Sequence, residues 1–233
     1  MLHPHAVLAA AVATAVSAVA AAQEPVSPPR LFDVPVAPAL RDGRLHVTAG
    51  LSHRGGGTVA IAAGLGGVAE VDIDLSDRLA AADEPRALHA TAGFKLAWPG
   101  ARTSAIPAAI AIGVRKSLAG QRDAVAQAFG IATIALGAVD LHAGIGRWAG
   151  DRWRPLAGVV WRTPRAPRTT LIADVAWAPE LGRSEPAQWI AHWGARYRAF
   201  RWGAIELGVR HRAGRPFDGA TVLLRVHAAV DWR

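Results

Sequence analysis

The sequence predicts an all-β protein, an antiparallel up-and-down transmembrane β-barrel of about 12 strands. Apolar residues recur at every second position along most of the chain, which is the period of a strand with two unlike faces. Short turns alternate with longer polar connections, as in a meander of antiparallel strands. Tryptophans gather near the ends of these runs, on the apolar face, where the two surfaces of a bilayer would lie.

The beginning of the chain predicts export. Residues 1–22 are expected to be a cleaved signal peptide, because the apolar run Ala6–Ala20 is short for a membrane-spanning helix and ends in small residues before Gln23. A membrane anchor is the alternative, since His3 and His5 stand where Lys or Arg is usual. The 233 residues include no cysteine, which excludes disulfides and thiolate metal sites.

Residues 23–43 form a Pro-rich lead into the first strand. It contains Pro25, Pro28, Pro29, Pro35 and Pro38. Proline fixes φ and removes a backbone donor, so this segment is expected to be an extended linker rather than part of the core. The barrel is then expected to occupy residues 44–233.

Each predicted strand alternates apolar residues with polar or small ones. In the first, leucine, valine and alanine alternate with histidine, threonine and glycine; the sixth is less regular and almost wholly apolar. The first six are Arg44–Ser52, Thr58–Leu65, Ala69–Ser76, Leu88–Trp98, Ile106–Arg115 and Gly130–Leu136. The last six are Val139–Gly146, Arg154–Arg162, Thr169–Ala178, Gln188–Ala199, Trp202–Arg212 and Thr221–Arg233. Minimal turns are expected at Gly66-Gly67, Gly137-Ala138 and Phe200-Arg201, and a short turn within Gly120–Phe129.

The third run poses the question of which face is inside. Three acids, Glu70, Asp72 and Asp74, alternate with Val71, Ile73 and Leu75. A soluble β-sandwich would bury the apolar face, whereas a membrane barrel would turn it to lipid and line its lumen with the acids. The even strand number, the strand lengths and the positions of the aromatic residues favour the membrane barrel. The expected aromatic girdles are Trp98, Trp161, Tyr197 and Trp232 at the periplasmic rim, and Trp177 and Trp189 at the outer rim.

The inward charges are expected to form two walls of opposite sign across the lumen. The acidic wall is Glu70, Asp72 and Asp74. The basic wall is Arg196, Arg198, Arg210, Arg212 and Arg225. An open pore with these walls would favour anions. The alternative is a lumen that the same charges close by pairing with one another, so that it conducts no ions.

Other chemistries find weaker support. The chain carries a net charge of +8, but its arginines are scattered at strand spacing rather than clustered, so no nucleic-acid partner is expected. Five inward histidines lie on five strands without evident convergence, and no metal or other cofactor is expected. Some outer-membrane barrels act on lipids, but the outward face has no serine and a single histidine, His211, so the chain is not expected to be an enzyme.

Three stretches resemble an outer-membrane barrel family linked to exopolysaccharide export: "VPVAPALRDGRLHVTAG" (34–50), "IPAAIAIGVRKSL" (106–118) and "LGAVDLHAGIGRWAG" (136–150). The resemblance spans about half of the chain and rests on turn and strand motifs. It departs at Lys116, where the family usually has an acid. It implies an outer-membrane location and polysaccharide passage, and it assigns no catalytic residue.

Together these observations predict a narrow passive channel or export-associated porin in a Gram-negative outer membrane. Its expected partners are membrane lipid and small anionic solutes or polysaccharide. A non-conducting structural or anchoring barrel is the second hypothesis. A soluble periplasmic β-sandwich and a lipid-acting barrel enzyme are the others. The oligomeric state is not predicted.

Overall fold

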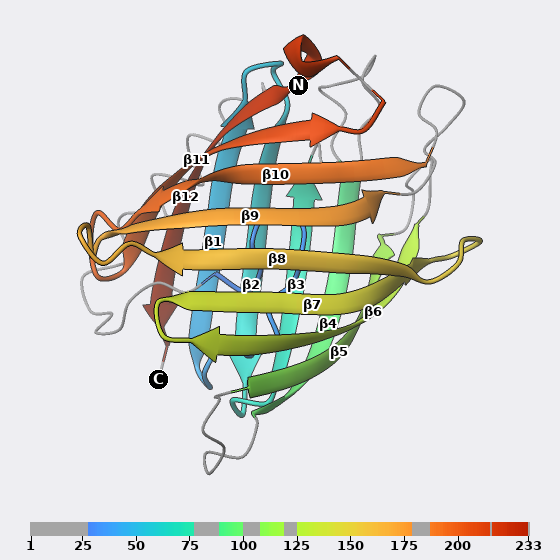
Figure 1. The fold of residues 1–233 in the computed structure, drawn as a ribbon. Helices are drawn as coiled ribbons and strands as arrows, with labels where there is room; N and C mark the ends of the chain where they lie inside the picture. Colours follow the sequence, from blue (N-terminus) through green and yellow to red (C-terminus); the bar gives the residue numbers. More distant parts are fainter. Residues whose placement is uncertain are drawn as a thin grey trace, which may run out of the picture.

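The computed structural model describes residues 28–76, 89–99, 108–118, 125–178, 187–214 and 216–232. Twelve antiparallel strands form a closed barrel in which each strand pairs with its neighbours in sequence and β1 closes on β12 (Figure 1). The first six are β1 (Arg44–Ser52), β2 (Gly57–Leu65), β3 (Ala69–Ser76), β4 (His89–Pro99), β5 (Ala108–Ser117) and β6 (Ala126–Leu136). They are followed by β7 (Val139–Trp148), β8 (Arg154–Arg162), β9 (Thr169–Ala178), β10 (Gln188–Tyr197), β11 (Gly203–Arg212) and β12 (Thr221–Asp231), with the 3-10 turn η2 (Phe217–Gly219) before β12. The predicted fold class is confirmed.

The strand boundaries agree closely with the sequence pattern, except at β6. This strand begins at Ala126, four residues earlier than expected, so the turn expected within Gly120–Phe129 is wrong for its last four residues. The segment Ala126–Phe129 lacks β-branched residues, but it still alternates, because Phe129 is buried in the lumen and Ala128 lies opposite Val114 on the outer face. No helix of the described residues is long and apolar enough to cross a membrane.

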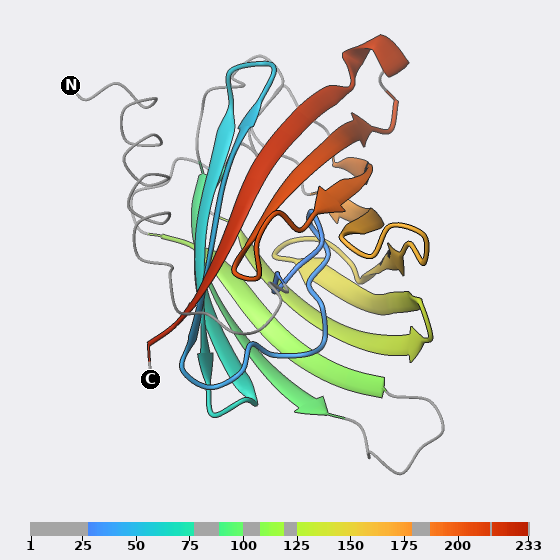
Figure 2. The same cartoon turned by 90° about the vertical axis from the view of Figure 1, so that its left-hand side faces the viewer.

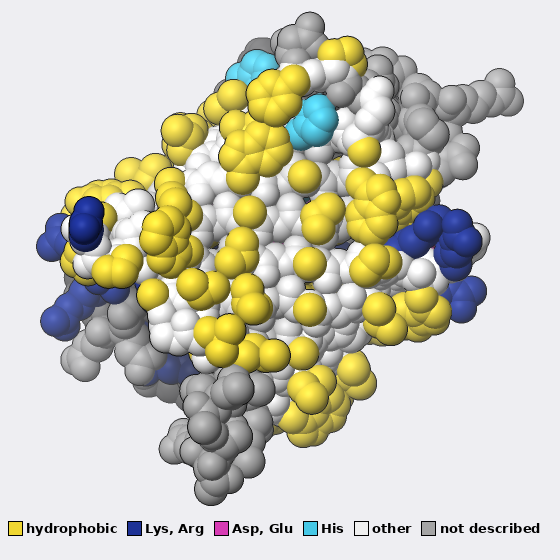
Figure 3. Space-filling model, viewed as in Figure 1, with side chains coloured by type: hydrophobic (Ala, Val, Ile, Leu, Met, Phe, Trp, Pro, Cys, Tyr) yellow, Lys and Arg dark blue, Asp and Glu magenta, His cyan; other side chains and the backbone are white. Residues whose placement is uncertain are grey.

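The two faces of the barrel are inverted relative to a soluble protein. On β3, Glu70, Asp72 and Asp74 are buried, whereas Ile73 is 56% exposed between two other exposed apolar residues. Large apolar side chains are exposed on every strand. Figure 3 shows them over the middle of one face, with Lys and Arg gathered at its two ends. A closed barrel with this outer surface excludes the soluble β-sandwich and is the architecture of a transmembrane barrel.

The barrel has two unlike ends. We call the end at which Arg44 and Asp231 lie the terminal end, and the opposite one the loop end. The aromatic residues of the predicted girdles divide between them. Trp98, Trp161, Tyr197 and Trp232 lie at the terminal end and are 44–52% exposed, whereas Trp177 and Trp189 lie at the loop end with ring centroids 5.2 Å apart. Trp193 lies in the middle of β10 and stacks on Phe217.

The described part of the Pro-rich lead, residues 28–43, lies inside the barrel. Figure 2 shows this segment, in blue, enclosed by the strands. Leu31, Phe32, Val34, Ala37 and Leu40 are all buried. The expectation of a linker outside the core is therefore wrong. The segment is not extended throughout either, because it doubles back at Leu31–Val34, where Arg30 and Pro35 form an antiparallel bridge. Apolar residues between the prolines fill the lumen, and lumenal side chains accept hydrogen bonds from five of its backbone N–H groups.

Inward-facing glycines make room for the lead. A Cβ on Gly158 of β8 would lie 2.3 Å from Leu31 Cδ1, and a Cβ on Gly208 of β11 would lie 2.4 Å from Phe32 Cε1. On β2, a Cβ at Gly64 would lie 2.1 Å from the carbonyl oxygen of Arg41. Alanine at these positions would overlap the lead, so the glycines form seats for two of its apolar side chains and for its backbone.

Candidate functional site

The lead is held in the middle of the lumen by Asp174 of β9. Its Oδ2 accepts hydrogen bonds from the backbone N–H groups of Phe32 (2.9 Å), Asp33 (2.7 Å) and Val34 (3.0 Å). Its Oδ1 lies 2.9 Å from His192 Nδ1, and the His192 ring stacks on Phe32 with centroids 5.1 Å apart. One buried carboxylate thus binds three consecutive donors, which fixes the turn at Leu31–Val34.

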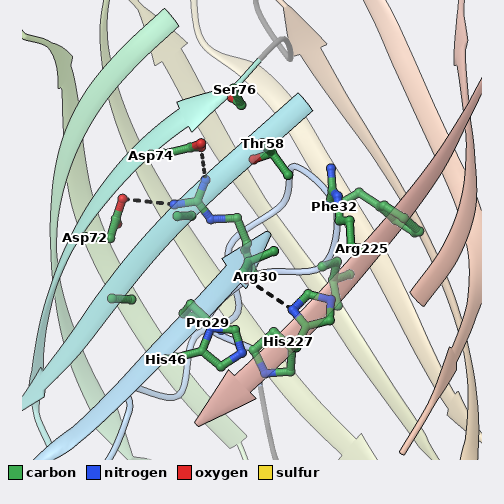
Figure 4. Close-up of a pocket in the computed structure, with 15 residues that line it drawn as sticks. Pro29, Arg30, Phe32, His46, Thr58, Asp72, Asp74, Ser76, Arg225 and His227 are labelled. Atoms are coloured by element: carbon green, nitrogen blue, oxygen red, sulfur yellow. Dashed lines mark hydrogen bonds and ion pairs between the residues drawn. The ribbon is translucent and has the colours of Figure 1, made fainter. Parts of the chain in front are cut away.

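A second contact joins the lead to the acidic strand β3. The Arg30 guanidinium lies 2.9 Å from Asp72 and 2.8 Å from Asp74 (Figure 4). Burial acts to lower the pKa of Arg30, but the neighbouring carboxylates outweigh it and raise this pKa above its ordinary value. From the other side, Arg115 of β5 contacts the same two carboxylates at 2.6 and 3.2 Å. Two cations therefore neutralise two acids in one buried cluster.

Glycine is required between the two strands of this cluster. Asp72 on β3 and Arg115 on β5 both lie opposite Gly93 of β4. A Cβ on Gly93 would lie 2.6 Å from Asp72 Oδ2, so the absence of a side chain lets the carboxylate lie over β4 and reach Arg115. A small cavity of about 30 Å³ adjoins the cluster, which is room for about one water molecule.

The remaining acid of β3 holds the end of the lead. Glu70 lies 3.1 Å from the Lys95 ammonium of β4 and accepts a hydrogen bond from the backbone N–H of Leu40 (3.1 Å). Lys95 also donates to the carbonyl oxygens of Val36 and Pro38, both at 3.1 Å. Thr133 of β6 accepts a hydrogen bond from the N–H of Ala37. The lead is thus bonded along most of its described length.

Glu206 of β11 forms the centre of a separate ionic cluster. Arg196 of β10 donates to it at 2.6 and 2.9 Å, Arg225 of β12 lies at 3.6 Å, and His227 lies at 3.3 Å. Arg225 also lies over the Phe32 ring, 5.1 Å from its centroid. This cluster therefore packs against the lead through the Phe32 ring.

The residues predicted to form two facing walls are all placed by the structure, but they divide into local groups. The three acids are bound by Arg30, Lys95 and Arg115, whereas Arg196 and Arg225 are bound by Glu206. Arg210 is buried and Arg212 is half-buried near the loop end of β11. Arg198 lies at the terminal end, just after β10.

A cavity of about 600 Å³ opens beside the lead at the terminal end of the lumen. Six arginines line it: Arg41, Arg44, Arg162, Arg168, Arg196 and Arg198. Arg41 pairs with Asp231, Arg162 pairs with Asp140, and Arg196 pairs with Glu206. Within the described part of the chain, Arg168 and Arg198 make no ion pair, and a backbone hydrogen bond from Arg198 N to Arg168 O places them side by side. The cavity therefore carries excess positive charge.

The inward histidines do not converge. His46 lies against His227, His142 is bonded to Thr133, and His192 is bonded to Asp174. His89 Nε2 lies 2.8 Å from Ser117 Oγ, a pairing that the sequence did not suggest. Ser117 is buried on the inward face, and its hydroxyl accepts the N–H of Val125. Among the residues that the structure describes, no group of three or more metal-ligating side chains forms a metal site.

Sequence reasoning missed the contribution of the lead to this site. Arg30 and the three N–H groups bound by Asp174 were assigned to a linker. Two signals were present in the sequence. The first is that the prolines are separated by Leu31, Phe32 and Val34, large apolar residues that a solvated linker does not need. The second is that several inward positions of the strands carry glycine, whereas a lumen filled only by strand side chains would favour larger residues there.

No model of a known protein family matches the chain, and no curated protein matches it in sequence. Solved structures with a similar fold include the KdgM porin, which is 3% identical with a TM-score of 0.55 over 79% of this chain and 98% of that one. Outer membrane phospholipase A from Escherichia coli, in an active-site mutant, is 10% identical with a TM-score of 0.50 over 89% and 94% of the two chains. A chain from a study of in-meso crystallization of membrane proteins is 8% identical with a TM-score of 0.54 over 81% and 84%. At these identities the similarity shows the barrel fold.

Proposed function

We propose that this protein is an outer-membrane barrel that works as a narrow channel for small anions, with its N-terminal lead as the constriction. The apolar outer surface supports a membrane location, and the expected signal peptide at residues 1–22 supports export. The fold similarity to the KdgM porin agrees with a channel.

The observation that carries the proposal is the arginine-lined cavity at the terminal end. Fixed positive charge in a narrow lumen attracts anions and repels cations. Arg168 and Arg198 supply this charge because no carboxylate of the described residues neutralises them. A volume of about 600 Å³ lies in the range of sites for small molecules, so it favours small anions over an extended polysaccharide.

The test is conductance of the refolded protein in a planar bilayer under a salt gradient. We expect discrete steps of small conductance with an anion-selective reversal potential. Replacing both unpaired arginines, Arg168→Ser with Arg198→Ser, should move the reversal potential toward zero or to the cation side. The matched control is Arg165→Ser with Arg201→Ser, which removes two exposed arginines from the same turns outside the cavity and should leave the potential unchanged.

A non-conducting structural barrel is the second candidate, and the bonding of the lead favours it. The lead is bound by Asp174, Glu70, Lys95 and Thr133 and fills the middle of the lumen. A bilayer that stays silent after insertion has been confirmed would support this candidate and refute the channel. Cation selectivity of the native protein would refute the role of the arginines.

We do not propose an enzymatic role, although one protein of similar fold is named as a phospholipase. The Ser117 hydroxyl is buried, faces the lumen and is engaged by the N–H of Val125, so it is not presented to a lipid substrate. We expect a serine-reactive fluorophosphonate to leave Ser117 unlabelled, and labelling that is lost in His89→Ala would overturn this expectation.

The link to exopolysaccharide export rests on the sequence resemblance.

A further inference from the structure

The outer face carries fixed positive charge at two neighbouring positions. Lys116 of β5 and Arg147 of β7 are exposed, and each is the residue before the last of its strand at the loop end. On the strands that the structure describes, they are the two Lys or Arg residues at outward-facing positions. A cation facing lipid costs several kcal/mol at the bilayer midplane but little near the interface. Their place at the strand ends therefore keeps them at the depth of lipid headgroups.

An outward-facing groove of about 610 Å³ lies between these two cations. Its floor is formed by alanines, because Ala92 and Ala126 lie opposite Lys116, and Ala128 lies opposite Arg147. Toward the middle of the barrel, the groove is bounded by Phe94 and Val114, which pair with each other. Most of the outer face carries exposed Ile, Leu and Val, so this patch of small residues is a depression between larger ones.

The two cations are free to bind a ligand. The Nε of Arg147 donates to the carbonyl oxygen of Asp151 (2.8 Å), which orients the guanidinium and leaves its terminal nitrogens available. Lys116 makes no ion pair within the described residues. The carboxylate of Asp151 is engaged elsewhere, by the N–H of Arg152 (2.7 Å) and the Trp177 indole (2.6 Å). The first of these hydrogen bonds is the main reason that the pKa of Asp151 lies below its usual range.

We propose that this groove binds one acylated lipid with a phosphate monoester headgroup, from the leaflet at the loop end. An acyl chain lies along the alanine floor, and the phosphate lies between Lys116 and Arg147. Two cations match a monoester, which carries close to two negative charges at neutral pH, better than the single charge of a phosphodiester. The proposal depends on the membrane location given under the proposed function, and it does not depend on conduction.

The test is the retention of added lipid by the purified protein in detergent, measured by native mass spectrometry. The probes are lipid A as the monoester, phosphatidylglycerol as the diester, phosphatidylcholine as the uncharged lipid, and inorganic phosphate. We expect lipid A to be retained best. Lys116→Gln and Arg147→Gln should each weaken its binding by about fivefold, the usual contribution of one cation near an anionic membrane surface. The control Arg165→Gln with Arg201→Gln removes two exposed cations at the terminal end and should bind as the native protein does.

A second variant tests the acyl-chain part of the site without changing any charge. Ala128→Leu fills the floor and should also reduce lipid retention, whereas Ala157→Leu, on the outer face of β8, should not. The shift between cold and boiled samples on detergent gels identifies variants that have folded. The proposal is overturned if lipid A and phosphatidylglycerol bind equally, if inorganic phosphate at an equal concentration displaces the lipid, or if the double variant of Lys116 and Arg147 retains lipid A undiminished. Lipid retention by a barrel that is silent in bilayers would refute the channel alone.

Discussion

The middle of the lumen and its terminal end use charge in opposite ways. In the middle, Asp72, Asp74 and Asp174 are each bound by cations or backbone N–H groups, and the lead fills the space between them. At the terminal end, Arg168 and Arg198 line an open cavity without an acidic partner among the described residues. Acids are paired with cations or N–H groups where the lead fills the lumen, whereas two arginines stay without an acidic partner in the described part of the chain where the lumen is open. The difference separates residues that hold the lead from residues available to a solute.

The largest test of this comparison removes the lead. Deleting residues 28–40 takes away the apolar filling and the Arg30 cation, so we expect conductance in planar bilayers to rise severalfold, since 12 strands enclose more space than their own inward side chains fill. The cold and boiled migration of the protein on detergent gels checks that the barrel still closes. Conductance equal to that of the native protein would mean that the lead is not the constriction.

A smaller change breaks the central attachment of the lead. Asp174→Asn leaves three N–H groups and His192 with a neutral partner, and breaking one side of a buried charged contact costs about 3–5 kcal/mol. We expect hydrogen exchange at residues 31–34 to accelerate while the strands stay protected. Asp140→Asn, which loses a partly exposed pair with Arg162, is the control and should leave this exchange unchanged. Equal exchange in both variants would show that Asp174 does not hold the lead.

The smallest test changes the seats of the lead by single methyl groups. Gly158→Ala and Gly208→Ala should each destabilise the docked lead by about 1–3 kcal/mol, because the new Cβ would overlap Leu31 or Phe32. Gly130→Ala is the control, since a Cβ there meets nothing closer than 4.0 Å. Hydrogen exchange of the lead is again the measurement. If Gly130→Ala has the same effect, the loss comes from the strand backbone rather than from the seats.

The fold was predictable because the signal repeats in every strand. Alternation placed Glu70, Asp72 and Asp74 on one face of β3, and the exposed Ile73 between them is explained only by a surface that meets lipid. The lead was not predictable in the same way. Its prolines are present whether the segment is solvated or buried, and the partners that distinguish the two cases are distant in sequence, from 30 positions for Glu70 and Leu40 to 142 positions for Asp174 and Phe32. Gly158 and Gly208 acquire their meaning only when Leu31 and Phe32 are placed against them.

The sequence separation between Phe32 and its partners on β9 and β10 bears on how the protein folds. Phe32 and Asp174 are 142 positions apart, and His192, which stacks on Phe32, is further still. The lead is synthesised before any strand, yet it reaches its final position only after β9 and β10 have joined the sheet. Contacts of such long range form slowly. The docked lead is therefore a late step of assembly, and its protection from exchange reports that the barrel has been completed.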